Sequence, residues 1–376
     1  MILVSVLALL SHGHALPFDQ RRILSEPSED NATMNAENHA ALFDTLVLKY
    51  NKNYADEKTR AHRFGVFKEN MKLAGDLNDA SSNGVKHGAN NKFFDMSHEE
   101  FKSKVLMTKK SGSRPRQGSL TLNSTTVSSG IPSSWDWRDR GAVTSVKDQG
   151  MAGTCWAFGA IGNIEGQLAI HQNNLVDLSV EQVADCAAGN ACGVWGGEAS
   201  DAFEYIINTG GIQTWDDYPY CLLDGQCSPC LAPGYDVDSC GVQPRHCKLE
   251  ESCHFDSSKA VATLTSWVSL SQNENELAAQ LVQNGPISVG LDADHLHTYS
   301  EGIVGTNYCS ADPEDGNHEV LIVGYGSTAS EEGGPEIPYW IAKNSWGADW
   351  GEDGYFRILR GNNACGIANQ AVTAIL

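Results

Sequence analysis

Apolar residues recur at helical spacing in the front part of the chain. Between residues 36 and 80 they form two stripes, made of Leu42, Phe43, Leu46, Val47 and Tyr50, and of Phe64, Phe67, Met71 and Ala74. Ser97 and Glu100 then have the spacing of a capping box that begins another helix. The pattern predicts a small helical domain over about residues 36–108.

The next part of the chain is also predicted to be helical. The stretch Gln149–Ala160 begins with small, turn-forming residues and becomes apolar at Cys155, which places that residue at the first turn of a helix. Ser179 with Gln182 caps a helix over residues 178–186. A further helical pattern, residues 199–207, follows a pair of glycines.

The pattern changes in the last third of the chain. Apolar runs bounded by Gly and Pro predict strands at residues 286–291, 320–325, 339–342 and 354–359. A helical lobe followed by a β-rich lobe is an α+β arrangement. The cleft between two such lobes is the expected place for an active site.

Composition and charge narrow the classes of function. Of the 376 residues, 41% are hydrophobic and 19% are charged, enough for a large core. Residues 1–130 carry 17 Lys and Arg residues and 14 Asp and Glu residues. The remainder of the chain carries nine Lys and Arg residues and 33 Asp and Glu residues. The acidic remainder argues against nucleic acid or an anionic membrane surface as a partner. It suits an acidic compartment or, alternatively, only the solubility of a secreted protein.

Several features point to the secretory pathway. Residues 1–15 resemble a signal peptide, and their apolar run is too short to span a bilayer. The 11 cysteines indicate an oxidising compartment. Asn31 and Asn123 begin glycosylation sequons, and residues 109–130 have the composition of an exposed, cleavable linker.

Four residues carry the candidate chemistry. Cys155 at a helix start is favoured as a thiolate, the form of cysteine that attacks carbonyl carbon. Gln149 is placed to donate to the resulting oxyanion. His318 lies at the entrance to a predicted strand and is a candidate base, and Asn344 follows another strand and is a candidate orienter of the imidazole. Trp346 is predicted to cover the bond between them.

These motifs resemble those of papain-family cysteine proteases. The similarity runs over residues 135–160, 178–185, 317–326, 339–361 and 365–368. It implies a two-lobed papain-like fold over residues 131–376 and peptide-bond hydrolysis through a thioester. It also implies Cys155 as nucleophile, His318 as general base and acid, Asn344 as orienter and Gln149 in the oxyanion hole.

Residues 16–130 resemble the inhibitory propeptide of cathepsin L-like zymogens. The matching positions of the family's helix motif and of the shorter motif after it are Arg63, Phe67, Asn70 and Asn78, and Asn91, Phe93 and Asp95. Thr59, Ala74 and Ala89 depart from it. The resemblance implies that the propeptide inhibits its own enzyme, and the positive propeptide against a negative body suggests a latch that acid weakens.

A cysteine-rich insert at residues 221–252 explains why His318 lies 163 residues after Cys155, farther than the usual 130–150. By resemblance Cys186 pairs with Cys253, and Cys309 with Cys365. Ala152 replaces a cysteine of the family, so Cys192 is expected to pair into the insert. Connectivity stays open among the six cysteines Cys192, Cys221, Cys227, Cys230, Cys240 and Cys247.

The insert allows two other interpretations. Its cysteines with His246 have the chemistry of a zinc site, but the oxidising compartment and the even count favour disulfides, so no metal is predicted. Cathepsin B carries a comparable insert with an adjacent histidine pair, whereas this chain has the separated His246 and His254. Endopeptidase activity is therefore ranked above exopeptidase activity. A catalytically silent binding homologue is the remaining alternative.

The resemblance also places the substrate-binding residues. They are Gly196, Gly197, Glu198, Ala199, Gly290, Gly316, Asn317, Trp346 and Gln370. Glu198 and Gln370 suggest tolerance of polar or basic side chains, although Glu198 is alternatively only a helix cap. Glu319 stands where the family has a small residue.

We expect a monomer that needs no cofactor, acts on proteins and peptides, is inhibited by cystatin-type proteins, and resides in a lysosome, an acidic vacuole or outside the cell.

Overall fold

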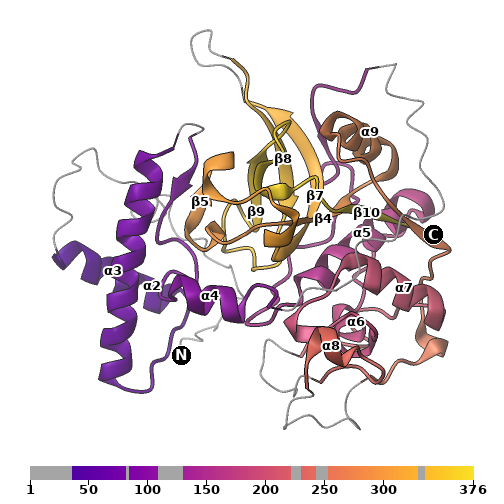
Figure 1. Ribbon diagram of the computed structural model, residues 1–376, viewed down its shortest axis with the longest axis horizontal. Coiled ribbons are helices and arrows are strands. Elements are labelled where there is room, and N and C mark those ends of the chain that lie inside the picture. The colour runs from indigo at the N-terminus through magenta and orange to yellow at the C-terminus, as the bar shows by residue number, and fades with distance from the viewer. Residues whose placement is uncertain (1–35, 82–83, 109–129, 222–229, 243–252, 329–334) are drawn as a thin grey trace, which may run out of the picture.

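A computed structural model describes residues 36–81, 84–108, 130–221, 230–242, 253–328 and 335–376. Helical residues dominate the first half and strands the second (Figure 1). The predicted α+β arrangement of two lobes preceded by a helical region is confirmed. Residues 1–35, with the proposed signal peptide and Asn31, lie outside the described part, as do Asn123 and most of the linker.

The front region consists of three helices and one short strand: α2 (Ala36–Lys49), α3 (Glu57–Asp79), β1 (Lys86–His87) and α4 (His98–Lys104). Asp56 and Ser97 cap α3 and α4 by accepting from backbone N–H groups, and the second of these is the cap predicted from the sequence. The two apolar stripes meet in one core that contains Phe43, Phe67 and Phe94.

The front region docks on the body through a pair of strands. Strand β1 pairs antiparallel with β5 (Tyr299–Glu301) of the body. Gly302 allows this approach, because a Cβ atom there would lie 2.3 Å from the backbone oxygen of Gly84. Helix α4 then leads the chain from α2 and α3 towards the middle of the body (Figure 1).

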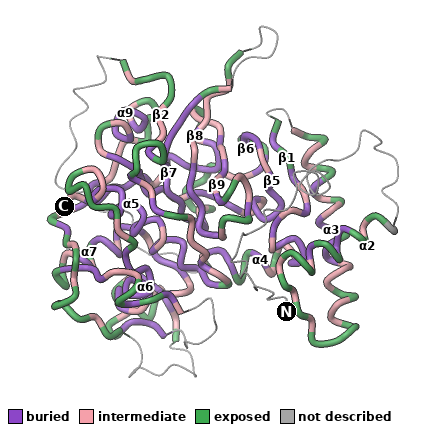
Figure 2. Tube along the Cα trace, turned by 180° about the vertical axis from the view of Figure 1, so that it is seen from behind, coloured by how far each residue is buried: buried purple, intermediate pink, exposed green. Residues whose placement is uncertain are grey.

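The helical lobe is built around α5 (Cys155–Gln172). This helix is mostly buried, as expected for a central helix, and its buried polar side chains Asn163, Glu165 and Gln167 are hydrogen-bonded. Helices α6 (Val180–Cys186) and α7 (Ala199–Thr209) pack with it in one core, and the short helix α8 (Val237–Cys240) lies in the insert. In Figure 2 the trace of α5 is coloured as buried, and exposed segments occur around α6 and α7.

The second lobe contains an eight-stranded sheet. Its order is β3 (Ser266–Ser269), β10 (Ala371–Ile375), β4 (Ile287–Leu291), β7 (His318–Ser327), β8 (Pro338–Lys343), β9 (Tyr355–Leu359) and β6 (Ile303–Val304), with β2 (Trp135–Asp136) on β7. The central strands β4, β7, β8 and β9 are those predicted from the sequence, and helix α9 (Glu274–Asn284) precedes β4. The edge strands β3 and β6 were not predicted, nor were β10 beside β3 and β2 on β7.

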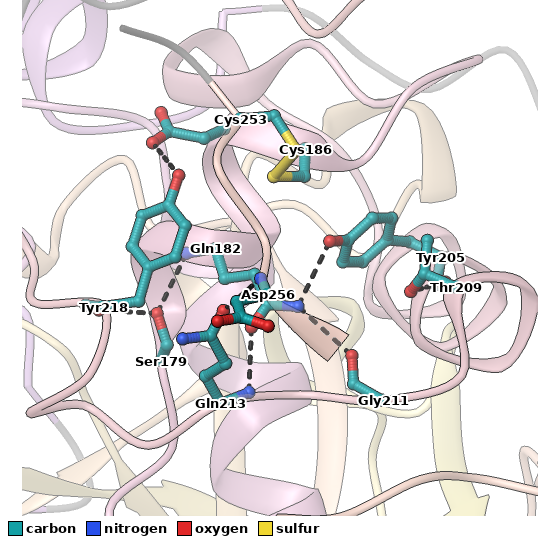
Figure 3. Close-up of a disulfide and its surroundings, with 11 residues drawn as sticks. Ser179, Gln182, Cys186, Tyr205, Thr209, Gly211, Gln213, Tyr218, Cys253 and Asp256 are labelled. Carbon is teal, nitrogen blue, oxygen red and sulfur yellow. Dashed lines mark hydrogen bonds between the residues drawn. A yellow bond between two sulfur atoms is a disulfide. The ribbon is translucent and has the colours of Figure 1, made fainter. Parts of the chain in front are cut away.

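Three disulfides join described residues, and one of them reaches the insert. Cys186 is bonded to Cys253 and Cys309 to Cys365, and Cys192 is bonded to Cys240 within the insert. Figure 3 shows the Cys186–Cys253 bridge above Ser179, which caps α6 by accepting from the Gln182 N–H at 3.0 Å. Cys221 and Cys230 are also disulfide-bonded, with partners outside the described residues, and Cys155 is free.

The Cys192–Cys240 bond is expected to stabilise the body. It closes a loop across a sequence separation of 48 residues, so the chain-entropy relation gives a loss of about 4 kcal/mol in the free energy of unfolding when it is removed. The double variant C192S/C240S, compared with wild type in denaturant unfolding, measures this loss. Equal unfolding free energies in the two proteins would contradict it.

Candidate active site

Cys155 lies at the N-terminus of α5 with its side chain fully buried. Backbone N–H groups of Glu319, Trp156 and Cys155 itself lie near the sulfur, and each lowers the pKa of the thiol. Burial has a larger and opposite effect, so the pKa of Cys155 lies well above its ordinary value. The helix start therefore presents N–H groups to the sulfur, but in this closed state the thiol stays protonated.

His318 and Asn344 meet at one end of two paired strands. His318 begins β7 and Asn344 follows the end of β8, and the antiparallel pairing of these strands brings the two residues together. His318 Nε2 lies 2.8 Å from Asn344 Oδ1. Because an amide oxygen only accepts, Nε2 carries the proton and Nδ1 is the basic atom of the neutral ring. Within the described part of the chain this Nδ1 has no hydrogen-bond partner.

Trp346 covers the imidazole, as its position in the sequence suggested. The rings of His318 and Trp346 have centroids 4.6 Å apart, and both side chains are buried. Burial lowers the pKa of His318 to about 4, against the opposing effect of its bond to Asn344. Cys155 and His318 are therefore both neutral in this state over most of the physiological pH range.

Gln149 is buried and held at both ends of its amide. Its Oε1 accepts from Ser345 Oγ at 2.6 Å, and its Nε2 donates to the backbone oxygen of Ala152 at 2.6 Å and of Val105 at 2.8 Å. Ser345 was not identified from the sequence as an orienting residue. The position of Ser345 directly after Asn344 is the feature of the sequence that could have identified it.

The front region crosses the site at residues 105–108. Besides the bond from Gln149 to the Val105 oxygen, the Met107 N–H donates to the oxygen of Asn317 and the Thr108 N–H to that of Trp195, both at 2.9 Å. A Cβ atom at Gly153 would lie 3.0 Å from the Leu106 oxygen. Backbone contacts on both sides thus hold this segment over Cys155, His318 and Gln149.

Aromatic side chains anchor the segment just before this crossing. Phe93 and Phe101 are fully buried and pack edge-on against Trp346, with centroids 5.5 and 5.3 Å away. The ring of Phe101 also lies 5.2 Å from that of His297. The side chain that covers His318 is therefore itself covered by the front region.

The expected substrate-binding residues form two groups. Gly197 lies against the indole of Trp156, where a Cβ atom would be 2.7 Å away, and the Gln370 side chain lies near Glu198 and lowers the pKa of its carboxyl group. Gln370 also approaches Gly290, so these residues from distant parts of the chain share one region. Burial, reinforced by the charge of Asp201, raises the pKa of Glu198 to about 8.

Other expected residues have different surroundings. The Asn317 side chain donates to Asp292 and Asp294, so only its backbone oxygen meets the front region. Gly196 accepts from the Cys192 N–H through its backbone oxygen, and Gly316 lies by the backbone of Pro313. The alternative that Glu198 only caps a helix has some support. Glu198 is the N-cap residue of α7, and its backbone N–H donates to the Asp201 carboxylate.

Neither a metal site nor a membrane span is found among the described residues. No group of three or more His, Cys, Asp or Glu side chains in this part is disposed to hold a metal ion. The part of the insert that contains His246 lies outside it, whereas His254 is described and stacks on Tyr218 with ring centroids 3.8 Å apart. The described helices are too short or too polar to cross a bilayer.

The chain is similar to known cysteine proteases and to their propeptides. The sequence profile described as papain family cysteine protease matches residues 131–375, and that of the cathepsin propeptide inhibitor domain (I29) matches residues 43–101. A probable cysteine protease, RD19C, of Arabidopsis thaliana is 37% identical over 94% of this chain and 88% of its own length. A viral cathepsin of Adoxophyes honmai nucleopolyhedrovirus is 37% identical over 87% of this chain and 88% of its own.

Solved structures of procathepsins resemble the front region and the body of this chain together. Digestive procathepsin L2 proteinase from the larval midgut of Tenebrio molitor matches with a TM-score of 0.75 and 31% identity, covering 90% of this chain and all of that one. Procathepsin L 3 from the same source matches with a TM-score of 0.72 and 33% identity, covering 90% and 99%.

Removing the Phe101 ring should uncover Cys155. Replacement of a buried Phe by Ala costs about 3–5 kcal/mol, which in F101A weakens the docking of the front region. We expect iodoacetamide to alkylate Cys155 slowly in the intact wild type and much faster in F101A, measured by mass spectrometry at one pH. L48A, at an exposed position of α2, is the control and should match wild type. Equal rates in F101A and wild type would contradict this account of the cover.

Proposed function

The chain belongs to the papain family of cysteine proteases, and we propose that Cys155, His318, Asn344 and Gln149 form the active site of an endopeptidase. In the uncovered enzyme, Cys155 gives its proton to His318 Nδ1 and the thiolate attacks the carbonyl carbon of the scissile peptide bond. The carbonyl oxygen becomes an oxyanion, to which Gln149 Nε2 and the Cys155 N–H donate. Asn344 keeps the imidazole in its plane and tautomer.

The second half of the reaction regenerates the enzyme. The imidazolium of His318 protonates the leaving amine, the carbon–nitrogen bond breaks and a thioester to Cys155 remains. His318 then removes a proton from water, whose oxygen attacks the thioester carbon. The carbon–sulfur bond breaks, the acid product leaves, and the proton returns to the thiolate–imidazole pair.

The bond from Gln149 Nε2 to the Val105 oxygen is the observation that carries this proposal. A carbonyl oxygen of the front region already takes the hydrogen bond that an oxyanion requires, beside a buried thiol and a histidine whose Nε2 is fixed by Asn344. The front region is a propeptide of the inhibitor type and covers the site. We infer that it excludes substrate by taking the same donors, and that mature enzyme begins near Ile131.

Acid release of the propeptide is supported by four histidines at its interface with the body. His87 and His98 belong to the propeptide, and His295 and His297 to the body; the His98 ring lies 5.6 Å from each of the latter two. His87 Nδ1 lies 2.8 Å from Thr298 Oγ1. Burial, followed by the neighbouring histidines, lowers the pKa of His87 and of His297 to about 4.

The direction of the pH effect follows from these pKa values. Above pH 6.5, the ordinary pKa of histidine, the rings are neutral whether docked or released and docking is unaffected. We propose that release returns both rings to the ordinary histidine pKa, so that between pH 6.5 and about 4 the released rings gain protons while the docked rings do not. Each of the two histidines therefore weakens docking by up to about tenfold per pH unit in that window.

The wider setting is proposed from sequence features. A signal peptide over residues 1–15, sequons at Asn31 and Asn123 and disulfides in the body support synthesis in the secretory pathway. A lysosome, an acidic vacuole or acidic extracellular fluid then supplies the pH for release. We propose a monomer that acts on proteins and peptides and is open to cystatin-type inhibitors.

The proposed function is tested by acidifying the purified zymogen and adding a thiol-directed epoxide. We expect labelling of Cys155 only once the propeptide is lost, and none in C155A. The labelled fraction should match the fraction of hydrolytic activity that is lost. Failure of the acid-treated protein to label at any pH would overturn both the nucleophile and the zymogen proposal.

Peptide end groups separate the endopeptidase from the exopeptidase alternative. The mature enzyme should cleave peptides with free and with amidated C-termini at similar internal positions and rates. The described His254 favours this outcome, because its stacking on Tyr218 gives it a packing role at the base of the insert. A strong preference for the free carboxylate would instead support exopeptidase activity through the insert.

Replacing the two most buried interface histidines should make the zymogen more resistant to acid. Asn is neutral at all pH values and can reproduce the Nδ1 contacts of His87 with Thr298 Oγ1 and of His297 with the Asp294 oxygen. In H87N/H297N the pH of half-maximal epoxide labelling should fall relative to wild type. H62N, at an exposed position of α3, is the matched control. An unchanged midpoint in H87N/H297N would show that these histidines do not govern release.

A further inference from the structure

Glu319 is a buried carboxyl group beside the proposed catalytic residues. It follows His318 in β7 and is only 7% exposed. Successive side chains of a strand point to opposite faces, so the carboxyl group points away from the imidazole. Its Oε1 accepts from Ser288 Oγ on β4 at 2.9 Å, and its Oε2 accepts from the backbone N–H of Ala199 at 3.1 Å. One side chain thus joins β7, β4 and the start of α7.

The same side chain packs on the helix of the nucleophile. Gly159 lies one turn after Cys155 in α5, and a Cβ atom there would be 3.2 Å from Glu319 Cγ and 2.6 Å from Ser288 Oγ. The backbone N–H of Glu319 also lowers the pKa of the Cys155 thiol, so it lies near the sulfur. Glu319 therefore contacts both of the elements that have to keep Cys155 and His318 in register.

The bond to Ala199 fixes a segment that binds substrate in the proposed function. Residues 196–199 run from the end of a 3₁₀ turn to the first residue of α7. Gly197 rests on the Trp156 indole, and the Ala199 N–H is held by Glu319. The first contact ties the segment to the nucleophile helix, and the second ties it to the histidine strand.

We propose that Glu319 is a positioning residue for substrate binding, whose carboxyl group holds residues 196–199 at a fixed distance from the strand that carries His318. This inference rests on the proposed function, since it assigns a role within that cleft. Loss of the carboxyl group lets the segment move relative to His318, so peptide substrates bind less tightly before any chemistry occurs.

Substitution by Gln retains the geometry. Burial, and then the charges of Glu198 and Asp201, raise the pKa of Glu319 well above its usual range, which favours the neutral carboxyl group. An amide, like a neutral carboxyl group, offers one acceptor and one donor end. The amide oxygen can accept from the Ala199 N–H while the amide nitrogen donates to Ser288 Oγ, because the hydroxyl group rotates.

Glu274 provides a matched control away from the cleft. It is also 7% exposed, and its two carboxylate oxygens accept from Trp340 Nε1 and from the Asn363 N–H, both at 2.7 Å. The pattern of one side-chain donor and one backbone donor is the same as at Glu319. A general loss of stability should therefore appear in E274A as well as in E319A.

The experiment compares KM and kcat of acid-matured wild type, E319A, E319Q and E274A with one peptide substrate. Active sites are counted by epoxide titration. Loss of the two bonds in E319A should raise KM about tenfold with kcat changed by less than about threefold. E319Q should restore KM to within about twofold of wild type, and E274A should leave KM unchanged while it lowers the unfolding temperature.

Two results would overturn the proposal: a KM for E319A no higher than that of E274A, or a KM for E319Q as high as that of E319A. If E319A does not fold, S288A replaces it, with an expected rise of about threefold in KM; in that case a wild-type KM in S288A overturns the proposal. Failure of the proposed function is distinct, because wild type would then bind no epoxide.

Discussion

Burial of a thiol and an imidazole under the same cover controls the chemistry of this zymogen. An ion pair between Cys155 and His318 requires water or preorganised dipoles to stabilise it, and the propeptide removes the water. In the closed state burial raises the pKa of Cys155 and lowers that of His318 to about 4, so the neutral forms prevail. The backbone N–H groups at the sulfur are already in place. We propose that uncovering the cleft shifts the pair towards its charged form.

The cover is held by contacts of different physical kinds. Strand pairing of β1 with β5 is independent of pH, and so is the aromatic packing of Phe101 on Trp346. Ion pairs such as Lys102 with Asp294 follow the opposite charges of propeptide and body. The interface histidines are the contacts proposed to weaken between pH 6.5 and about 4, where released rings gain protons and docked rings do not. We therefore propose that acid weakens the histidine contacts of the interface, while the strand pairing and the aromatic packing are unaffected by pH.

Local sequence context identifies most of the fold and the central residues of the candidate site. The turn before Cys155, the entrance to β7 and the end of β8 are each readable from a few neighbouring residues. Strands β3 and β10 were missed because a short apolar run near a turn is too short for its periodicity to distinguish a strand from a helix. Alternation along β7 indicates that Glu319 faces away from its neighbour, but not that Ser288 and Ala199, from distant parts of the chain, receive it. The choice of Cys240 for Cys192 is likewise set by the folded insert.

The central claim concerns the protonation of His318, which NMR of its imidazole nitrogens reports directly. The spectrum should be recorded at about pH 5.5, between the pKa of about 4 in the covered state and the ordinary value. The account predicts a neutral ring, protonated at Nε2, in the intact zymogen and an imidazolium in the mature enzyme. H318N identifies the signal. An imidazolium in the intact zymogen would contradict the claim that the propeptide keeps the pair neutral.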